Sequence, residues 1–129
     1  MFIAYVRESR YTKQMLEQNG EFTVNIPLSP IDKKILGYCG TKSGRDRDKF
    51  ADLKLTPVTS EVVSVPGIRE LPLTLECKVI YKQKQELAAI PQPILDRYYP
   101  QNVDSSFPGS NRDYHIAYYG EIVNAYIAE

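Results

Sequence analysis

The sequence has no tryptophan, one histidine and two cysteines among its 129 residues. Cys39 and Cys77 form no CxxC pair, and His115 is near neither of them in sequence, so no metal-binding site is predicted. No apolar run approaches the roughly 20 residues that span a bilayer. The first residues lack the basic region and cleavage site of a signal peptide. We therefore expect a cytoplasmic protein without membrane contact, with two buried thiols and no disulfide.

Charge of one sign is not in excess either, because Lys plus Arg and Asp plus Glu each number 16. No net field draws the chain to nucleic acid or to an anionic membrane, although a local anion site remains compatible with this balance. The sequence shows no Ser/His/Asp order and no paired-carboxylate motif, so no catalytic side chain is assigned. This lack favours a reaction whose chemistry is carried by a bound cofactor.

What is present is a single domain, residues 1–129, that is mainly β with short helices. Apolar runs and period-two alternation predict antiparallel strands, of which the first is buried and the last bends at Gly120. Helical spacing and caps predict the helices, with Ser9 capping the first and Ser29-Pro30 opening the second. The expected strands are 2–6, 22–26, 55–65, 73–81 and 114–127, and the expected helices are 10–18, 30–39, 49–53 and 93–98. This order favours a small β-barrel or sandwich.

Two stretches could bind an anion. In the first, Arg7-Glu8-Ser9-Arg10-Tyr11-Thr12, an apolar strand gives way to a helix whose free N–H groups attract negative charge. The arginines and hydroxyls there could add donors to a phosphate. The alternative is a capped surface helix with two solvated arginines, and spacing alone favours that alternative.

The second stretch runs from Gly40 to Phe50 and joins a glycine loop to several cations. It lacks the GxxxxGK[ST] order of a P-loop. It could hold a phosphate or a ring carbonyl, or it could be a solvated turn whose arginines and aspartates pair weakly. The charge pattern alone favours the solvated turn.

Three stretches together resemble the flavin reductase-like (flavoredoxin-like) family. They are Val6-Arg7-Glu8-Ser9-Arg10-Tyr11-Thr12, then Cys39-Gly40-Thr41-Lys42-Ser43-Gly44-Arg45-Asp46-Arg47-Asp48-Lys49-Phe50, then Tyr119-Gly120-Glu121-Ile122-Val123. Two further segments, 22–26 and 75–78, match in the expected order between them. Each piece is short, but their order and spacing together are specific.

The resemblance implies an antiparallel, Greek-key split β-barrel that binds FMN, usually as a homodimer with flavin near the interface. It places one group of residues at the phosphate and ribityl chain, namely Arg7, Ser9, Arg10, Tyr11 and Thr12. It places a second group, Ser43, Gly44, Asp48 and Lys49, along the other wall. His115 would lie near a nicotinamide donor, NADH or NADPH.

Members of that family carry a strand and loop ahead of the first strand here, so we expect a chain truncated at its N-terminus relative to the family. Such a chain would expose a strand edge or close its barrel through a partner subunit. Two further functions stay open. One is a non-catalytic electron carrier that serves a redox partner protein, and the other is a structural remnant that binds no flavin.

Overall fold

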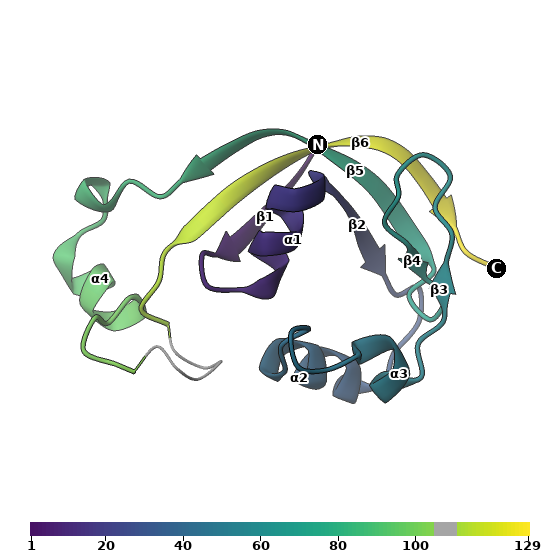
Figure 1. Cartoon of the computed structure of the whole chain (residues 1–129), viewed down its shortest axis with the longest axis horizontal. Helices are drawn as coiled ribbons and strands as arrows, with labels where there is room; N and C mark the ends of the chain where they lie inside the picture. The colour runs from purple at the N-terminus through teal and green to yellow at the C-terminus, as the bar shows by residue number, and fades with distance from the viewer. Residues whose placement is uncertain (105–110) are drawn as a thin grey trace.

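The computed structural model describes residues 1–104 and 111–129. Its main feature is one four-stranded antiparallel sheet with the strand order β1-β6-β5-β2. In that order, the strands are β1 (Phe2–Arg7), β6 (His115–Ile127), β5 (Leu73–Lys84) and β2 (Glu21–Ile26). The sheet curls into an arch, as Figure 1 shows. The mainly β, antiparallel architecture predicted from the sequence is therefore confirmed.

Short helices and one small ribbon complete the described residues. Helix α1 lies under the concave side of the arch, whereas α2 and α3 lie farther from the sheet and α4 lies near the far end of β5 and β6 (Figure 1). The bounds are α1 (Tyr11–Asn19), α2 (Lys33–Thr41), α3 (Lys49–Leu53), the 3-10 turn η1 (Leu87–Ala89), α4 (Gln92–Tyr98), β3 (Pro57–Val58) and β4 (Gly67–Ile68). The predicted position of α4 is confirmed.

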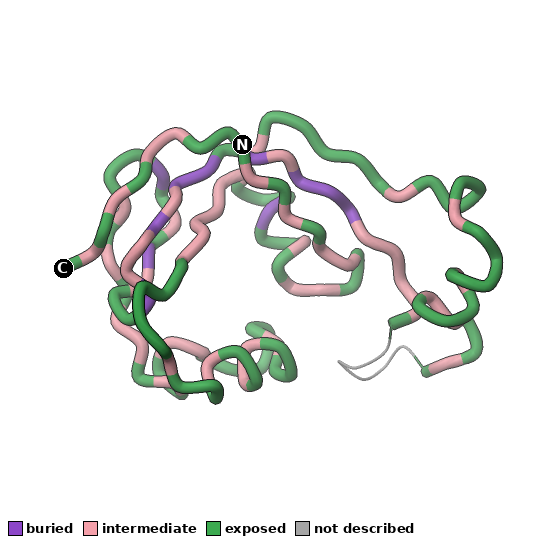
Figure 2. The backbone as a smooth tube through the Cα atoms, turned by 180° about the vertical axis from the view of Figure 1, so that it is seen from behind, coloured by how far each residue is buried: buried purple, intermediate pink, exposed green. Residues whose placement is uncertain are grey.

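The core lies between α1 and the sheet. Leu16 on α1 packs with Ile116 and Tyr118 on β6. Because alternate residues of a strand face the same side, Ile116 and Tyr118 both point toward the helix. Figure 2 shows that the buried residues form short runs along the strands and that most of the backbone is exposed or half-buried.

Gly120, where the last strand was predicted to bend, lies against an aromatic ring. A Cβ at Gly120 would lie 2.5 Å from Cζ of Phe22, so the Phe22 ring passes directly over the glycine. The β5–β6 register shifts at the same level, between Val79 and Tyr81. The extra residue at this level is Ile80 of β5, whereas the extra residue of β6 is Val123. The bend at Gly120 stays a prediction, and the absence of a side chain there makes room for the ring.

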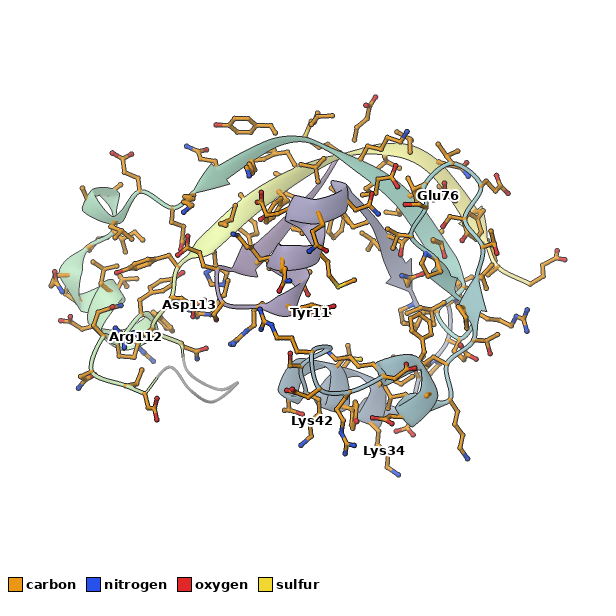
Figure 3. The ribbon with its side chains drawn as sticks, in the orientation of Figure 1. Tyr11, Lys34, Lys42, Glu76, Arg112 and Asp113 are labelled. Atoms are coloured by element: carbon orange, nitrogen blue, oxygen red, sulfur yellow. The ribbon has the colours of Figure 1, made fainter. Side chains whose placement is uncertain are left out.

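Glu76 anchors the loop that covers the other face of β5. Its buried carboxylate accepts the backbone N–H groups of Glu61 at 2.6 Å, Val62 at 2.7 Å and Val63 at 3.2 Å. Burial alone would raise the pKa of this carboxyl, but the three donors hold the pKa below its usual value. Figure 3 shows Glu76 between the strand and that loop. The carboxylate takes the place of a neighbouring strand for these N–H groups.

That anchor explains one wrong prediction. A strand was expected over residues 55–65, but only Pro57–Val58 is a strand there, paired with Gly67–Ile68. The N–H groups farther along are bonded to Glu76 rather than to a sheet neighbour.

The first strand was predicted to be buried, and this is wrong as well. β1 is an edge strand, and its side chains alternate between half-buried and exposed. Ile3 is 37% exposed and Tyr5 66% exposed, because no described element covers these two side chains on the face of β1 away from α1.

Two predicted helix starts also differ from the structure. Arg10, not Ser9, is the N-cap residue of α1, and the N–H of Ser9 donates to Oδ2 of Asp113 at 2.8 Å. Helix α2 begins at Lys33, where Asp32 accepts the N–H of Lys34 at 2.9 Å. An aspartate carboxylate caps a helix at least as well as serine does, which moves the start past Ser29-Pro30.

Of the two free thiols, Cys77 is buried as predicted, whereas Cys39 is only half-buried. Within the described ranges, no helix is both long enough and apolar enough to cross a membrane.

Candidate functional site

The structure brings the two predicted anion-binding stretches together. Nη1 of Arg45 donates to the carbonyl oxygen of Ser9 at 3.1 Å. The Arg45 guanidinium lies 5.4 Å from the ring centre of Tyr11, within reach of a cation–π contact. A Cβ at Gly44 would lie 2.9 Å from Cδ1 of Tyr11. The glycine loop therefore rests on the first turn of α1, and Figure 3 shows Tyr11 facing that loop.

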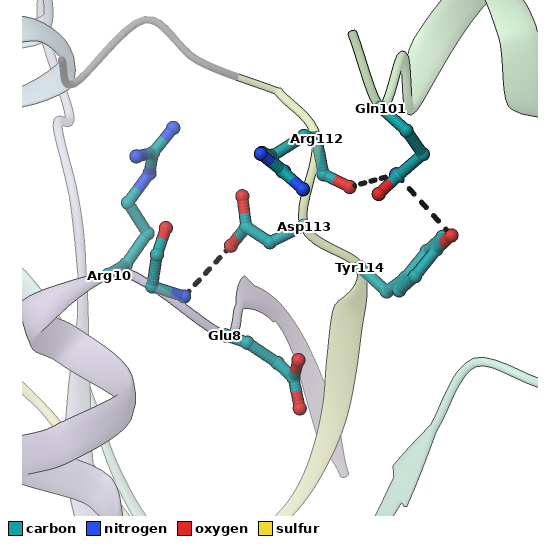
Figure 4. Close-up of a pocket in the computed structure, with 7 residues that line it drawn as sticks. Glu8, Arg10, Gln101, Arg112, Asp113 and Tyr114 are labelled. Carbon is teal, nitrogen blue, oxygen red and sulfur yellow. Dashed lines mark hydrogen bonds between the residues drawn. The ribbon is translucent and has the colours of Figure 1, made fainter. Parts of the chain in front are cut away.

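A pocket of about 280 Å³ opens beside the start of α1. Figure 4 shows it between the segment after β1 and the segment before β6. Its walls combine two arginines, two carboxylates and uncharged polar groups. They are formed by Glu8, Ser9, Arg10, Gln101, Arg112, Asp113 and Tyr114.

Both carboxylates of this pocket already have partners. Asp113 accepts the N–H of Ser9, and Lys84 pairs with Glu8 at 2.7 Å. Burial raises the pKa of Asp113, but the Ser9 donors and the nearby Arg10 charge outweigh it, so the pKa stays below its usual value. The pocket thus places the guanidinium-bearing residues Arg10 and Arg112 beside two carboxylates that have partners, and guanidinium groups are the side chains that bind anions best.

Arg7 lies next to this pocket and is engaged by the protein itself. Its Nη1 donates to the carbonyl oxygens of Asn111 at 3.1 Å and Asp113 at 2.5 Å. Its guanidinium lies 5.0 Å from the ring centre of Tyr99. In this structure Arg7 holds the chain that leads into β6.

The remaining predicted residues divide between exposed and structural positions. Thr12 is exposed on the first turn of α1. Oγ of Ser43 accepts the N–H of Arg45 at 3.2 Å, which shapes the glycine loop. Asp48 caps α3 by accepting the N–H of Ala51 at 3.1 Å, and Nζ of Lys49 donates to the carbonyl of Cys39 at 2.9 Å. The structure thus gives Asp48 and Lys49 roles in holding α3.

His115 begins β6 directly opposite Arg7 of β1. Its Nδ1 lies 2.9 Å from Oη of Tyr99, and its N–H donates to Oε1 of Gln85 at 2.8 Å. Burial lowers the pKa of His115, the Arg7 charge lowers it further, and Asp113 opposes this only in part. The ring is half-buried, and these effects favour its neutral form.

A second pocket of about 330 Å³ lies on the concave side of the sheet, lined by Lys13, Glu17, Lys82, Lys84 and Ile116. Lys82 pairs with Glu17 at 2.6 Å. The Lys84–Glu8 ion pair lies between the two pockets, because Glu8 lines the first pocket and Lys84 lines the second. Nowhere in the described part of the chain do three or more metal-binding side chains gather.

Sequence reasoning missed Arg45, Arg112 and Asp113. The signal for the last two is the pairing of the first strand with the last strand. Because the strands are antiparallel, residues just before β6 must lie beside residues just after β1. That placement puts Arg112 and Asp113 next to Ser9 and Arg10.

Comparison with known proteins identifies the family and the fold. The family description "Flavin reductase like domain" matches residues 1–129. A protein of Archaeoglobus fulgidus is 39% identical over 75 residues, which cover 58% of this chain and 42% of that protein. The flavoredoxin of Desulfovibrio vulgaris (Miyazaki F) has a TM-score of 0.64 at 28% identity, over 98% of this chain and 54% of that one.

The fold also matches a putative flavin reductase with a split barrel domain from Shewanella frigidimarina. The TM-score is 0.61 at 18% identity, over 98% of this chain and 51% of the other. The arch is therefore the antiparallel sheet of a split barrel, and the chain belongs to the flavin reductase-like family. It spans about half the length of the flavoredoxin and less than half of the archaeal relative.

Proposed function

We propose that this chain is an FMN-binding redox domain that uses NADH or NADPH to reduce flavin and passes the electrons onward. One observation carries the proposal: in a member of the flavin reductase-like family, the Gly44–Arg45 loop is bonded to the turn before α1 and packs against Tyr11 of its first turn. This contact brings the Arg45 guanidinium to the start of α1, where Arg10 also lies. That combination suits the phosphate of FMN.

The residues at the start of α1 fit a phosphate. The first N–H groups of a helix have no partner inside the helix, and the helix dipole favours negative charge there. Arg10 and Arg112 border the adjoining pocket, and Ser9 and Thr12 supply hydroxyls. A dianionic phosphate would gain charge-assisted hydrogen bonds from both arginines.

The other predicted site residues are assigned to the rest of the flavin and to the nicotinamide. Bound flavin supplies the hydride-accepting chemistry, so the side chains need only bind, orient and exclude water. We assign Tyr11, Ser43 and Gly44 to the wall along the ribityl chain and place His115 toward the nicotinamide. The free thiols of the described residues suit a cytoplasmic protein.

We also propose that the domain works as a homodimer. The chain exposes 8534 Å², whereas a compact monomer of 14.7 kDa exposes about 6,900 Å². On the face of the sheet away from α1, the ring centres of Tyr81 and Tyr119 are 5.1 Å apart. Ile3 of β1 lies opposite Tyr119 of β6. Tyr5 extends this apolar surface, which a second copy could cover.

One observation favours a different function, that of a structural remnant without flavin. The guanidinium of Arg7 and the N–H of Ser9, both predicted phosphate donors, are bonded to the protein's own oxygen atoms. If FMN binds, Asp113 must release Ser9 or the phosphate must use the other donors.

A spectroscopic titration tests the proposal. FMN added to the purified chain should give a shifted flavin spectrum with quenched fluorescence, and NADH or NADPH should then bleach the flavin absorbance. Flavin binding without bleaching would instead indicate an electron carrier that serves a redox partner protein. A spectrum identical to that of free FMN, up to high micromolar protein, would show that the chain binds no flavin. The structural remnant would then be the function that remains.

A further inference from the structure

Gln85, Tyr99 and His115 form a closed ring of hydrogen bonds where β5 and β6 meet the end of α4. The backbone N–H of His115 donates to Oε1 of Gln85 at 2.8 Å. Nε2 of Gln85 donates to Oη of Tyr99 at 3.0 Å, and Oη of Tyr99 lies 2.9 Å from Nδ1 of His115. Each of the three residues is therefore bonded to the other two, and His115 takes part through both its backbone and its side chain.

One fixed donor sets the orientation of the Gln85 amide. A backbone N–H can only donate, so the Gln85 atom facing it must be the oxygen. The amide nitrogen of Gln85 then faces Tyr99 and donates to Oη. The hydroxyl has one proton of its own, and the acceptor that the ring offers to it is Nδ1 of His115. All three groups are satisfied when Nδ1 carries no proton.

We propose that Gln85 and Tyr99 are positioning residues that hold His115 as the neutral tautomer with its proton on Nε2. His115 then presents an N–H donor, not an acceptor, to whatever binds beside it. The matching ligand chemistry is a carbonyl oxygen. Under the proposed function this is the carboxamide of the nicotinamide, and only this choice of ligand rests on that function.

The outer nitrogen, Nε2, is the atom that would meet a ligand. Within residues 1–104 and 111–129, no hydrogen-bond partner is found for Nε2 of His115. In the same ranges, Oη of Tyr126 is the buried side-chain polar atom without a partner. Nε2 is therefore not a buried, unpaired atom, and His115 as a whole is half-buried.

The charges around the ring agree with a neutral imidazole. Arg7 lies opposite His115 on β1, with its guanidinium over the Tyr99 ring, and Arg10 adds a second positive charge. Asp113, two residues before His115, is the opposing negative charge, and it is held by the N–H of Ser9. Burial and these arginines lower the pKa of His115.

Nitrogen NMR tests the proton placement directly, because His115 is the single histidine of the chain. The sample is the whole chain labelled with 15N-histidine, without flavin or nicotinamide, so the result does not depend on the proposed function. Well above the midpoint of the His115 titration, we expect a pyridine-type shift for Nδ1 and a pyrrole-type shift for Nε2. A pyrrole-type Nδ1 in the unmodified protein would overturn the proposal.

The variant Gln85→Glu should reverse the ring. A carboxylate there still accepts the His115 N–H, but its second oxygen accepts the Tyr99 proton instead of donating to Oη. Oη then accepts from Nδ1, so the proton moves to Nδ1 and its shift becomes pyrrole-type. The control Gln83→Glu places the same charge at an exposed position two residues away and should leave the tautomer unchanged. A Gln85→Glu protein with an unprotonated Nδ1 would also contradict the proposal.

Discussion

The guanidinium of Arg45 donates to the carbonyl oxygen of Ser9 at 3.1 Å, across 36 positions of sequence. This bond joins the loop after α2 to the turn before α1. It makes one candidate site out of two stretches that are each unremarkable alone. The site therefore depends on how closely the loop can approach the helix.

Gly44→Ala tests that approach. The new Cβ would lie 2.9 Å from Cδ1 of Tyr11, so the loop or the ring must move. We expect flavin affinity to fall by about tenfold, which corresponds to overpacking of about 1–2 kcal/mol. Fluorescence titration with FMN measures the loss.

Gly40→Ala is the matched control, because a Cβ there meets nothing within 4 Å. Gly40 lies inside α2, so the substitution should stabilise the chain by about 0.5–1 kcal/mol and leave flavin affinity unchanged. Equal losses of flavin affinity in Gly44→Ala and Gly40→Ala would show that flavin binding does not depend on the contact between Gly44 and Tyr11.

Gly120→Ala should destabilise the fold. The Cβ would lie 2.5 Å from Cζ of Phe22 and 3.0 Å from Cβ of Cys77, so both neighbours must shift. We expect a loss of about 1–3 kcal/mol in the free energy of unfolding, measured by urea denaturation. The double variant with Phe22→Leu should recover part of that loss, and a loss that is unchanged would argue against the ring contact.

Glu76→Gln should loosen the loop over residues 61–63. The neutral amide retains one oxygen acceptor for three N–H groups, so we expect about 1–3 kcal/mol of destabilisation at pH 7. Because the folded pKa of Glu76 is depressed, its contribution is complete above the unfolded pKa and disappears as the pH falls through the folded value. The variant should therefore lose less stability than the unmodified protein between neutral and acidic pH. If the free energy of unfolding fell equally with pH in the variant and in the unmodified protein, the stabilising role of the ionised Glu76 carboxylate would be contradicted.

The dimer surface can be disrupted from the exposed face of the sheet. Tyr81 is 54% exposed and packs against Tyr119, so Tyr81→Glu would place a charge in the middle of the apolar surface. We expect the variant to be a monomer by light scattering, whereas the control Tyr98→Glu on α4 remains a dimer. An unmodified protein that is already monomeric would refute the dimer.

The fold was largely predictable because its strands carry a period-two pattern. Leu73, Leu75 and Cys77 alternate with polar residues, and the strand β5 is found there. The same pattern conceals Glu76, since a glutamate between apolar residues is usually solvated. Its burial depends on a loop that folds back over the strand, and no local pattern encodes that contact.

The site was predictable only in part. The stretches around Ser9 and Gly44 were identified, and they do meet. Arg112 and Asp113 were missed because their place depends on the pairing of the first strand with the last, a contact between distant parts of the sequence. Ser9 was expected to cap α1, but a carboxylate from that distant segment bonds its N–H instead.

The most direct measurement is the affinity of the chain for FMN compared with riboflavin, by calorimetry at low and at physiological salt. If the phosphate binds at the start of α1, FMN should bind about 10- to 100-fold more tightly, and the double variant Arg10→Gln/Arg112→Gln should lose that preference. Arg97→Gln on α4 serves as the control and should keep it. Equal affinity for the two flavins in the unmodified protein, or a preference that survives the loss of both arginines, would contradict the account.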